Sequence, residues 1–130
     1  MIAGVALGDQ WKESDYRDAL CEGMRMEVTL PKQSRADCVS DTHAIEVEFD
    51  NKWKEAVGQA LTYAQQTELI PGIILICRRA ESKCRDASLF IQETFLAYGI
   101  EATIWECSAS DRTLADCVEK WVCKGGGCSD

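Results

Sequence analysis

The stretch "RADCVSDTHAIEVEF" at residues 35–49 predicts two short strands joined by the turn "SDTH". Side chains in a strand point alternately to its two faces. The second strand therefore has an apolar face and an acidic face, with Ile45, Val47 and Phe49 on the first and Glu46 and Glu48 on the second. The hairpin therefore places two carboxylates of one strand on the same face of the sheet.

The register of the hairpin follows from the length of its turn. If "SDTH" is a four-residue turn, Asp37 lies opposite Glu46 and Arg35 lies opposite Glu48. Two facing carboxylates destabilise a strand pair unless a cation compensates them. Mg²⁺ is a natural candidate, because it prefers a few carboxylates together with water. The hairpin thus predicts a metal-binding carboxylate pair beside an Arg–Glu ion pair.

The elements around the hairpin indicate an α/β fold. Apolar spacing predicts, in chain order, helix 14–24, strands 25–30, 35–39 and 43–49, helix 52–67, strand 72–77, helix 86–99, strand 100–107 and a last helix 111–123. The core order is α-β-β-β-α-β-α-β, a meander followed by a β-α-β crossover pattern. We expect one mixed central sheet flanked by helices.

Length and composition predict a single domain. At 130 residues the chain can build one real core but not two. We assign residues 14–123 to this domain and residues 124–130 to a flexible tail. Residues 1–13 form an N-terminal segment, either the remnant of a signal peptide or an ordinary terminus. No apolar run approaches the roughly 18 residues of a membrane span.

The formal charge of −8 argues against a general nucleic-acid binder, which usually carries a basic patch. One local cluster runs against the overall charge: Arg78, Arg79, Lys83 and Arg85. From the sequence it is either a small basic patch or, more commonly for such a run, a solvated loop.

The eight cysteines indicate disulfides and an oxidising compartment, either the periplasm or the outside of the cell. No C-x2-C pair of the kind that zinc sites favour occurs, so a structural zinc protein is the least favoured interpretation. Short loops or neighbouring elements suggest Cys77–Cys84, Cys107–Cys117 and Cys21–Cys38 as pairs, although eight cysteines allow 105 pairings. The remaining two disulfide candidates are Cys123 and Cys128.

Polar residues on the helix after the hairpin add to the candidate site. Gln59 and Tyr63 are four residues apart and share one helix face. They are either surface residues or a polar face directed at the sheet, next to the strand that carries Glu46 and Glu48.

The element order, with an acid on the second strand and E-x-[acid or Lys] on the third, resembles the PD-(D/E)xK nuclease superfamily over residues 14–107. The resemblance implies a restriction-endonuclease-like core. It implies metal ligation by Asp37 and Glu46, assisted by Glu22 of the first helix, and nucleic-acid orientation by Gln59 and Tyr63. The stretch from Ser40 onward is also similar to small bacterial proteins of exported type.

The chain departs from the family pattern at one position, where Glu48 replaces the lysine that helps to activate the attacking water. Lys52 and Lys54, at the start of the following helix, are the candidates to substitute for it. The resemblance implies Mg²⁺- or Mn²⁺-dependent phosphodiester hydrolysis. In it Glu48 would accept the proton of the water, while Arg35 and the two lysines would contact phosphate.

The competing hypothesis is a catalytically inactive nuclease-fold module that interacts with or inhibits a protein partner. The acidic charge and the missing lysine favour it, whereas the grouping of Asp37, Glu46 and Glu48 with Gln59 and Tyr63 favours an enzyme acting on nucleic acid. The sequence does not fix the oligomeric state.

Overall fold

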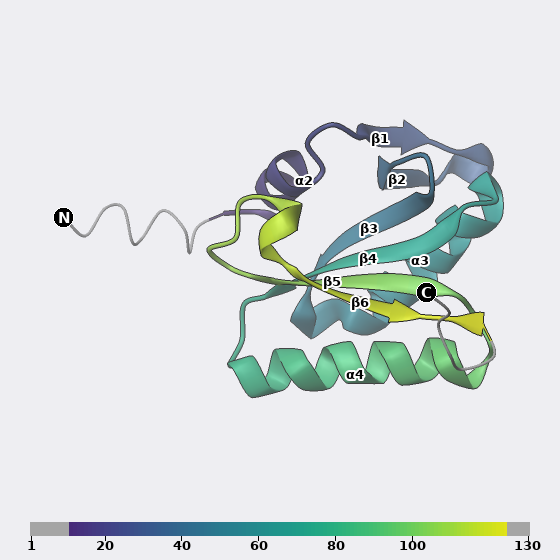
Figure 1. Ribbon diagram of the computed structural model, residues 1–130. Coiled ribbons are helices and arrows are strands. Elements are labelled where there is room, and N and C mark those ends of the chain that lie inside the picture. The colour runs from purple at the N-terminus through teal and green to yellow at the C-terminus, as the bar shows by residue number, and fades with distance from the viewer. Residues whose placement is uncertain (1–10, 125–130) are drawn as a thin grey trace.

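A six-stranded mixed sheet forms the centre of the protein in the computed structural model, which describes residues 11–124 (Figure 1). The strands lie in chain order across the sheet: β1 (Arg25–Thr29), β2 (Arg35–Val39), β3 (His43–Phe49), β4 (Ile70–Cys77), β5 (Ala102–Ser108) and β6 (Val118–Val122). Within these residues the α-helices are α2 (Glu13–Leu20), α3 (Trp53–Thr67) and α4 (Glu81–Ala97).

Strands β3, β4 and β5 are parallel, and every other neighbouring pair is antiparallel. The continuous apolar run of β4 suits its central position, since a strand in the parallel part of a sheet is covered on both faces. Helices α3 and α4 form the two crossovers between the parallel strands. The expected α/β class and mixed, helix-flanked sheet are confirmed.

Helices cover both faces of the sheet. Tyr16 and Leu20 of α2 pack on Ile45, Val47 and other residues of one face. On the opposite face, α3 and α4 pack on the alternate residues of β4 and β5, through Ala56, Ala60, Ala87, Ile91 and Phe95. Figure 1 shows α4 running along one side of the sheet, with α2 near the end at which β1 and β2 lie.

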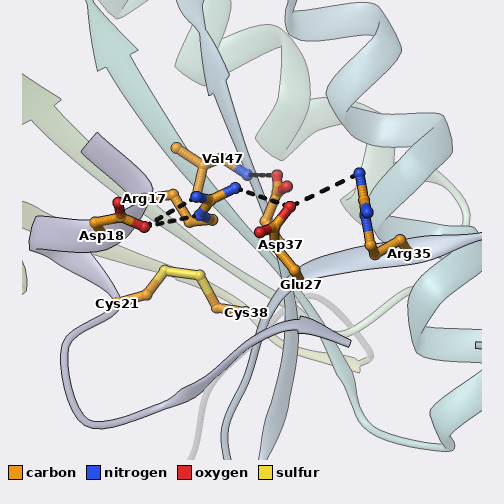
Figure 2. A network of polar contacts seen from close by, with 8 residues as sticks. All are labelled: Arg17, Asp18, Cys21, Glu27, Arg35, Asp37, Cys38 and Val47. Atoms are coloured by element: carbon orange, nitrogen blue, oxygen red, sulfur yellow. Dashed lines mark hydrogen bonds and ion pairs between the residues drawn. A yellow bond between two sulfur atoms is a disulfide. The ribbon is translucent and has the colours of Figure 1, made fainter. Parts of the chain in front are cut away.

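Strands β2 and β3 have the predicted register over a short distance. Cys38 pairs with Ile45 and Val39 pairs with Ala44, as the four-residue turn requires. The strand pairing then ends, and the Oδ2 atom of Asp37 accepts the backbone N–H of Val47 at 2.8 Å (Figure 2). A side chain therefore replaces a backbone partner at the point where the two strands separate.

The expected helix over residues 111–123 is wrong. This segment contains a short 3₁₀ turn at Leu114–Asp116 and the strand β6, which pairs with β5. The apolar spacing resembled that of a helix, yet Val118 and Trp121 are 55% and 61% exposed. The Cys107–Cys117 disulfide holds the segment beside β5, whose free edge supplies backbone partners.

Within the described part of the chain three disulfides join cysteine pairs, and they are the three expected pairs: Cys21–Cys38, Cys77–Cys84 and Cys107–Cys117. Among residues 11–124 no cysteine is free. Cys128, the expected tail and most of the N-terminal segment lie outside the described residues. In the described part of the chain, no helix has both the length and the apolar character needed to cross a membrane.

Candidate metal centre

Four carboxylates from three elements meet where β2 and β3 separate. Glu13 comes from the first turn of α2, Asp37 from β2, and Glu46 and Glu48 from β3. Oxygen atoms of Glu13, Glu46 and Glu48 all lie within 4.8 Å of one another. Asp37 joins the group by sharing a hydrogen bond with Glu46. We call these four residues the carboxylate cluster.

The cluster is shielded from water. Glu46 and Glu48 are only 3% and 6% exposed, and Glu13 and Asp37 are half-buried. Within residues 11–124, no lysine or arginine forms an ion pair with any of the four carboxylates. The nearest cationic influences are Lys52, which acts on Glu13, and Arg17, which interacts with Asp37. The negative charge of the cluster is therefore poorly compensated.

Burial and mutual repulsion shift the protonation of the cluster. Burial, followed by the charge of Asp37 and a hydrogen bond with it, raises the pKa of Glu46 to about 10. Burial, followed by the hydrogen bond that Glu13 donates to Glu48 and by the charge of Glu48, raises the pKa of Glu13 to about 8. Without a cation, both carboxyls hold their protons at neutral pH. A divalent ion would displace these protons.

Helix α3 directs two polar side chains at Glu46. The Tyr63 hydroxyl is hydrogen-bonded to Glu46, and burial, with the charge of Glu46, raises the pKa of Tyr63. The amide of Gln59, oriented by its neighbours with the nitrogen toward Glu46, donates to both carboxylate oxygens. Both side chains also line a groove of about 570 Å³ beside the helix. The structure thus brings Gln59 and Tyr63 to the expected carboxylate.

The expected ion pair between Arg35 and Glu48 is wrong. Arg35 is exposed and lies 3.7 Å from Glu27 of the neighbouring strand β1. Glu48 is buried, shares a hydrogen bond with Glu13, and accepts the backbone N–H of Phe49 at 3.0 Å. Arg35 nevertheless lines the groove beside Gln59 and Tyr63. The pairing fails because β2 and β3 separate before Arg35 reaches the level of Glu48.

Glu27 occupies an unusual place beside the cluster. It lies between the paired residues Met26 and Val28, opposite Asp37, and its φ angle is +50°. Such a backbone conformation is strained for any residue but glycine. Figure 2 shows its carboxylate between the guanidinium groups of Arg17 and Arg35. The distance between Glu27 Oε1 and Arg17 Nη1 is 3.3 Å. Glu27 thus forms ion pairs with Arg17 and Arg35, the two arginines beside Asp37.

Glu13, and not Glu22, is the carboxylate that the first helix contributes. Helix α2 ends at Leu20, and Glu22 lies exposed in the turn that follows. Glu13 is not among the residues expected from the sequence, because the apolar spacing predicts a helix start one residue later. An acid in the first helical turn is common, so its position alone gave no functional signal.

The two candidate lysines lie at the start of α3. Lys52 precedes the helix and influences Glu13, whereas the Nζ atom of Lys54 lies 5.7 Å from the centre of the Trp53 ring. Both are exposed. Of the two lysines, Lys52 is therefore the one that acts electrostatically on Glu13 of the carboxylate cluster.

The donor set of the cluster suits a hard divalent cation. Carboxylate oxygens are the ligands that Mg²⁺ prefers, and a few of them with water complete its shell. Oxygens that converge within 4.8 Å and lack a paired cation meet this requirement. A second group of potential ligands, Cys107, Asp111 and Cys117, does not, since its two sulfurs form a disulfide.

The comparisons with protein-family models, with curated proteins and with solved structures find no match for this chain.

Proposed function

We propose that the protein is a metal-dependent phosphodiester hydrolase with a PD-(D/E)xK-like centre. The observation that carries the proposal is the convergence of Glu13, Asp37, Glu46 and Glu48 where β2 and β3 separate. The order of elements from α2 to β5 agrees with the restriction-endonuclease-like core that the sequence resembles.

Mg²⁺ or Mn²⁺ held by Glu13, Asp37 and Glu46 would lower the pKa of a bound water and offset charge on the scissile phosphate. The protein's own residues prepare the ligands. Val47 N–H fixes one oxygen of Asp37, and Gln59 and Tyr63 hold Glu46. These bonds leave little freedom of rotation to the two carboxylates, so that the ligands are preorganised.

Glu48 stands where the family keeps a lysine. Its Oε1 atom accepts the N–H of Phe49, and it also bonds to Glu13. In the proposed reaction, Glu48 accepts the proton of the attacking water. Lys52 supplies positive charge near Glu13, and Arg35 contacts phosphate from the groove beside Gln59 and Tyr63.

The experiment is hydrolysis of plasmid, single-stranded DNA and RNA by the oxidised protein with Mg²⁺ or Mn²⁺. We expect cleavage that requires the metal, with at least a hundredfold loss in Asp37→Ala and Glu46→Gln. Glu93→Gln is a matched control, because Glu93 is an exposed acid of α4 far in sequence from the cluster. Equal activity in all variants, or none in the wild type, would contradict the proposal.

A second candidate function is a catalytically inactive module that binds a protein partner, either as an adaptor or as an inhibitor. The replacement of the family lysine by Glu48 favours it, as does the charge of −8. Metal binding without cleavage of any of the three substrates would support this alternative over the hydrolase.

The disulfides bear on where either function takes place. Three disulfides in a domain of this size fit an oxidising environment and are rare in reducing compartments. We therefore place the protein in the periplasm or outside the cell. Localisation of a tagged full-length chain in cell fractions tests this assignment.

A further inference from the structure

Exposed cations gather at the end of the sheet where β3 and β4 finish. Segments 50–54 and 78–86 together contain six cations and three acids, a balance of +3 on a chain of charge −8. The six cations are Lys52, Lys54, Arg78, Arg79, Lys83 and Arg85, and all are exposed. We call this surface the basic corner.

Four of the six cations form no ion pair within the described residues, and one of these four, Arg78, has its guanidinium 3.6 Å from the centre of the Phe49 ring. Arg79 is committed to buried Asp50, and Arg85 lies 3.5 Å from Glu81. Among residues 11–124, no acid forms an ion pair with Lys52, Lys54, Arg78 or Lys83. In the sequence these cations belong to two separate segments, and only the fold brings them to one surface.

Aromatic rings lie among the cations. Trp53 and Phe90 have ring centres 5.6 Å apart, and Phe90 is 46% exposed. With Arg79, Lys83 and the acid Asp86 they line a pocket of about 200 Å³. This volume is smaller than the roughly 300–1,000 Å³ of a pocket for a drug-sized ligand, so the pocket suits one flat ring or one phosphate.

The fold holds the basic corner in place and connects it to the carboxylate cluster. The Cys77–Cys84 disulfide closes the loop that carries Arg78, Arg79 and Lys83. Arg79 Nε donates to Asp50 at 2.8 Å, which ties the same loop to the end of β3. Lys52, one residue before Trp53, acts electrostatically on Glu13 of the cluster. The corner is a preformed surface that leads to the proposed metal centre.

We infer that the basic corner binds a single strand of nucleic acid and feeds it to the carboxylate cluster. Cations would track the phosphates, and the Trp53–Phe90 pocket would receive an unpaired base. A duplex keeps its bases stacked on each other and out of such a pocket, which favours a single strand as the occupant. The inference rests on the proposed function for the second step alone, since binding needs no catalysis.

The test is fluorescence anisotropy of a labelled single-stranded oligonucleotide, and of the same sequence as a duplex, in EDTA. The full-length oxidised protein is used, so that binding is measured without hydrolysis. We expect the single strand to bind more tightly than the duplex, and its affinity to fall as salt rises, with a slope of about −0.7 per phosphate contacted.

Matched variants locate the surface. Lys54→Glu combined with Lys83→Glu should weaken single-strand binding about tenfold and flatten the salt slope. Arg25→Glu, an exposed cation of edge strand β1, should change it less than about twofold. Phe90→Ala should weaken binding about fivefold, while Leu89→Ala, 48% exposed on the same helix, should not. Thermal unfolding confirms that each variant is folded.

Three results would overturn the inference: no single-strand binding at low salt, tighter binding of the duplex, or equal effects at Lys54/Lys83 and Arg25. The experiments can refute this inference and the proposed hydrolase independently of each other. Binding at the basic corner without cleavage would refute the hydrolase and leave the docking surface standing. Cleavage that Lys54→Glu with Lys83→Glu leaves unchanged would refute the docking surface and leave the hydrolase standing.

Discussion

Asp50 and Glu46 are two buried acids on the same stretch of chain, with opposite surroundings. Asp50 is 0% exposed and accepts hydrogen bonds from Arg78 N–H at 3.0 Å and from the Arg79 guanidinium at 2.8 Å. Glu46 is 3% exposed, and its partners are neutral donors and other carboxyl groups. One acid has its counter-ion within the fold, and the other does not.

This difference separates a structural acid from a candidate ligand. A buried charge with a hydrogen-bonded partner needs nothing further from solution. A buried carboxyl among other carboxyls either keeps its proton or binds a cation, so its state depends on pH and on metal. Added metal should therefore change the carboxylate cluster around Glu46, whereas loss of an ion-pair partner should affect the site around Asp50.

Among the substitutions, the largest effect on stability is expected at Asp50. Asp50→Ala removes the partner of Arg79 and leaves the N–H of Arg78 without its acceptor, which should lower the free energy of unfolding by about 3–4 kcal/mol. Urea denaturation at neutral pH measures it. The loss of stability should be the same with and without Mg²⁺. If added metal restored the stability of Asp50→Ala, the contrast between Asp50 and the carboxylate cluster would be wrong.

Each centre is braced by its own disulfide. Cys21–Cys38 ties the end of α2 to the residue next to Asp37, and Cys77–Cys84 brackets the arginines around Asp50. Replacing either pair by serine should cost about 2–3 kcal/mol, more for the longer first loop. Only Cys21→Ser with Cys38→Ser should also weaken Mg²⁺ binding in calorimetry. Equal metal affinity in the two double variants would show that this bridge does not position the cluster.

Much of the fold could be predicted from local patterns. Alternation in β3, the apolar run of β4 and the four-residue turn gave the strands and the register at Cys38 and Val39, because these depend on near neighbours. The helix expected over 111–123 failed because its spacing fits both periods and the free edge of β5 decided between them.

The site could be predicted only in part. Asp37, Glu46 and Glu48 share one hairpin, and Gln59 and Tyr63 follow on the next helix, so short-range geometry grouped them. Glu13 reaches the cluster through the packing of α2 on the sheet, which no spacing in the sequence encodes. The pairing of Arg35 with Glu27 likewise depends on where β2 leaves β3.

The pH should also change the stability of the metal-free protein. The folded state retains protons on Glu46 and Glu13, whose pKa values rise from 4.5 to about 10 and about 8. The unfolded chain releases them near pH 4.5, so stability falls as the pH rises from about 5 toward 10. Thermal unfolding in EDTA should show this fall, and Glu46→Gln should reduce it. A stability that rises over this range would contradict the shift.

The smallest effect is expected at Tyr63. Tyr63→Phe removes the hydroxyl that bonds to Glu46 and leaves the ring in its packing position. We expect Mg²⁺ affinity to fall about tenfold, the lower end of the usual effect of losing a partner behind a ligand. Stability without metal should change by no more than about 1 kcal/mol. Thr62→Val, which changes an exposed residue of the same helix, is the control.

Isothermal titration calorimetry with Mg²⁺ and Mn²⁺ tests the central claim most directly, on the wild type, Asp37→Ala and Glu46→Gln. We predict binding to the wild type at millimolar concentration or below, release of protons that decreases between pH 6 and 8 as Glu13 begins to lose its proton before the metal binds, and no binding to either variant. Absence of binding to the wild type, or binding that survives both substitutions, would contradict it.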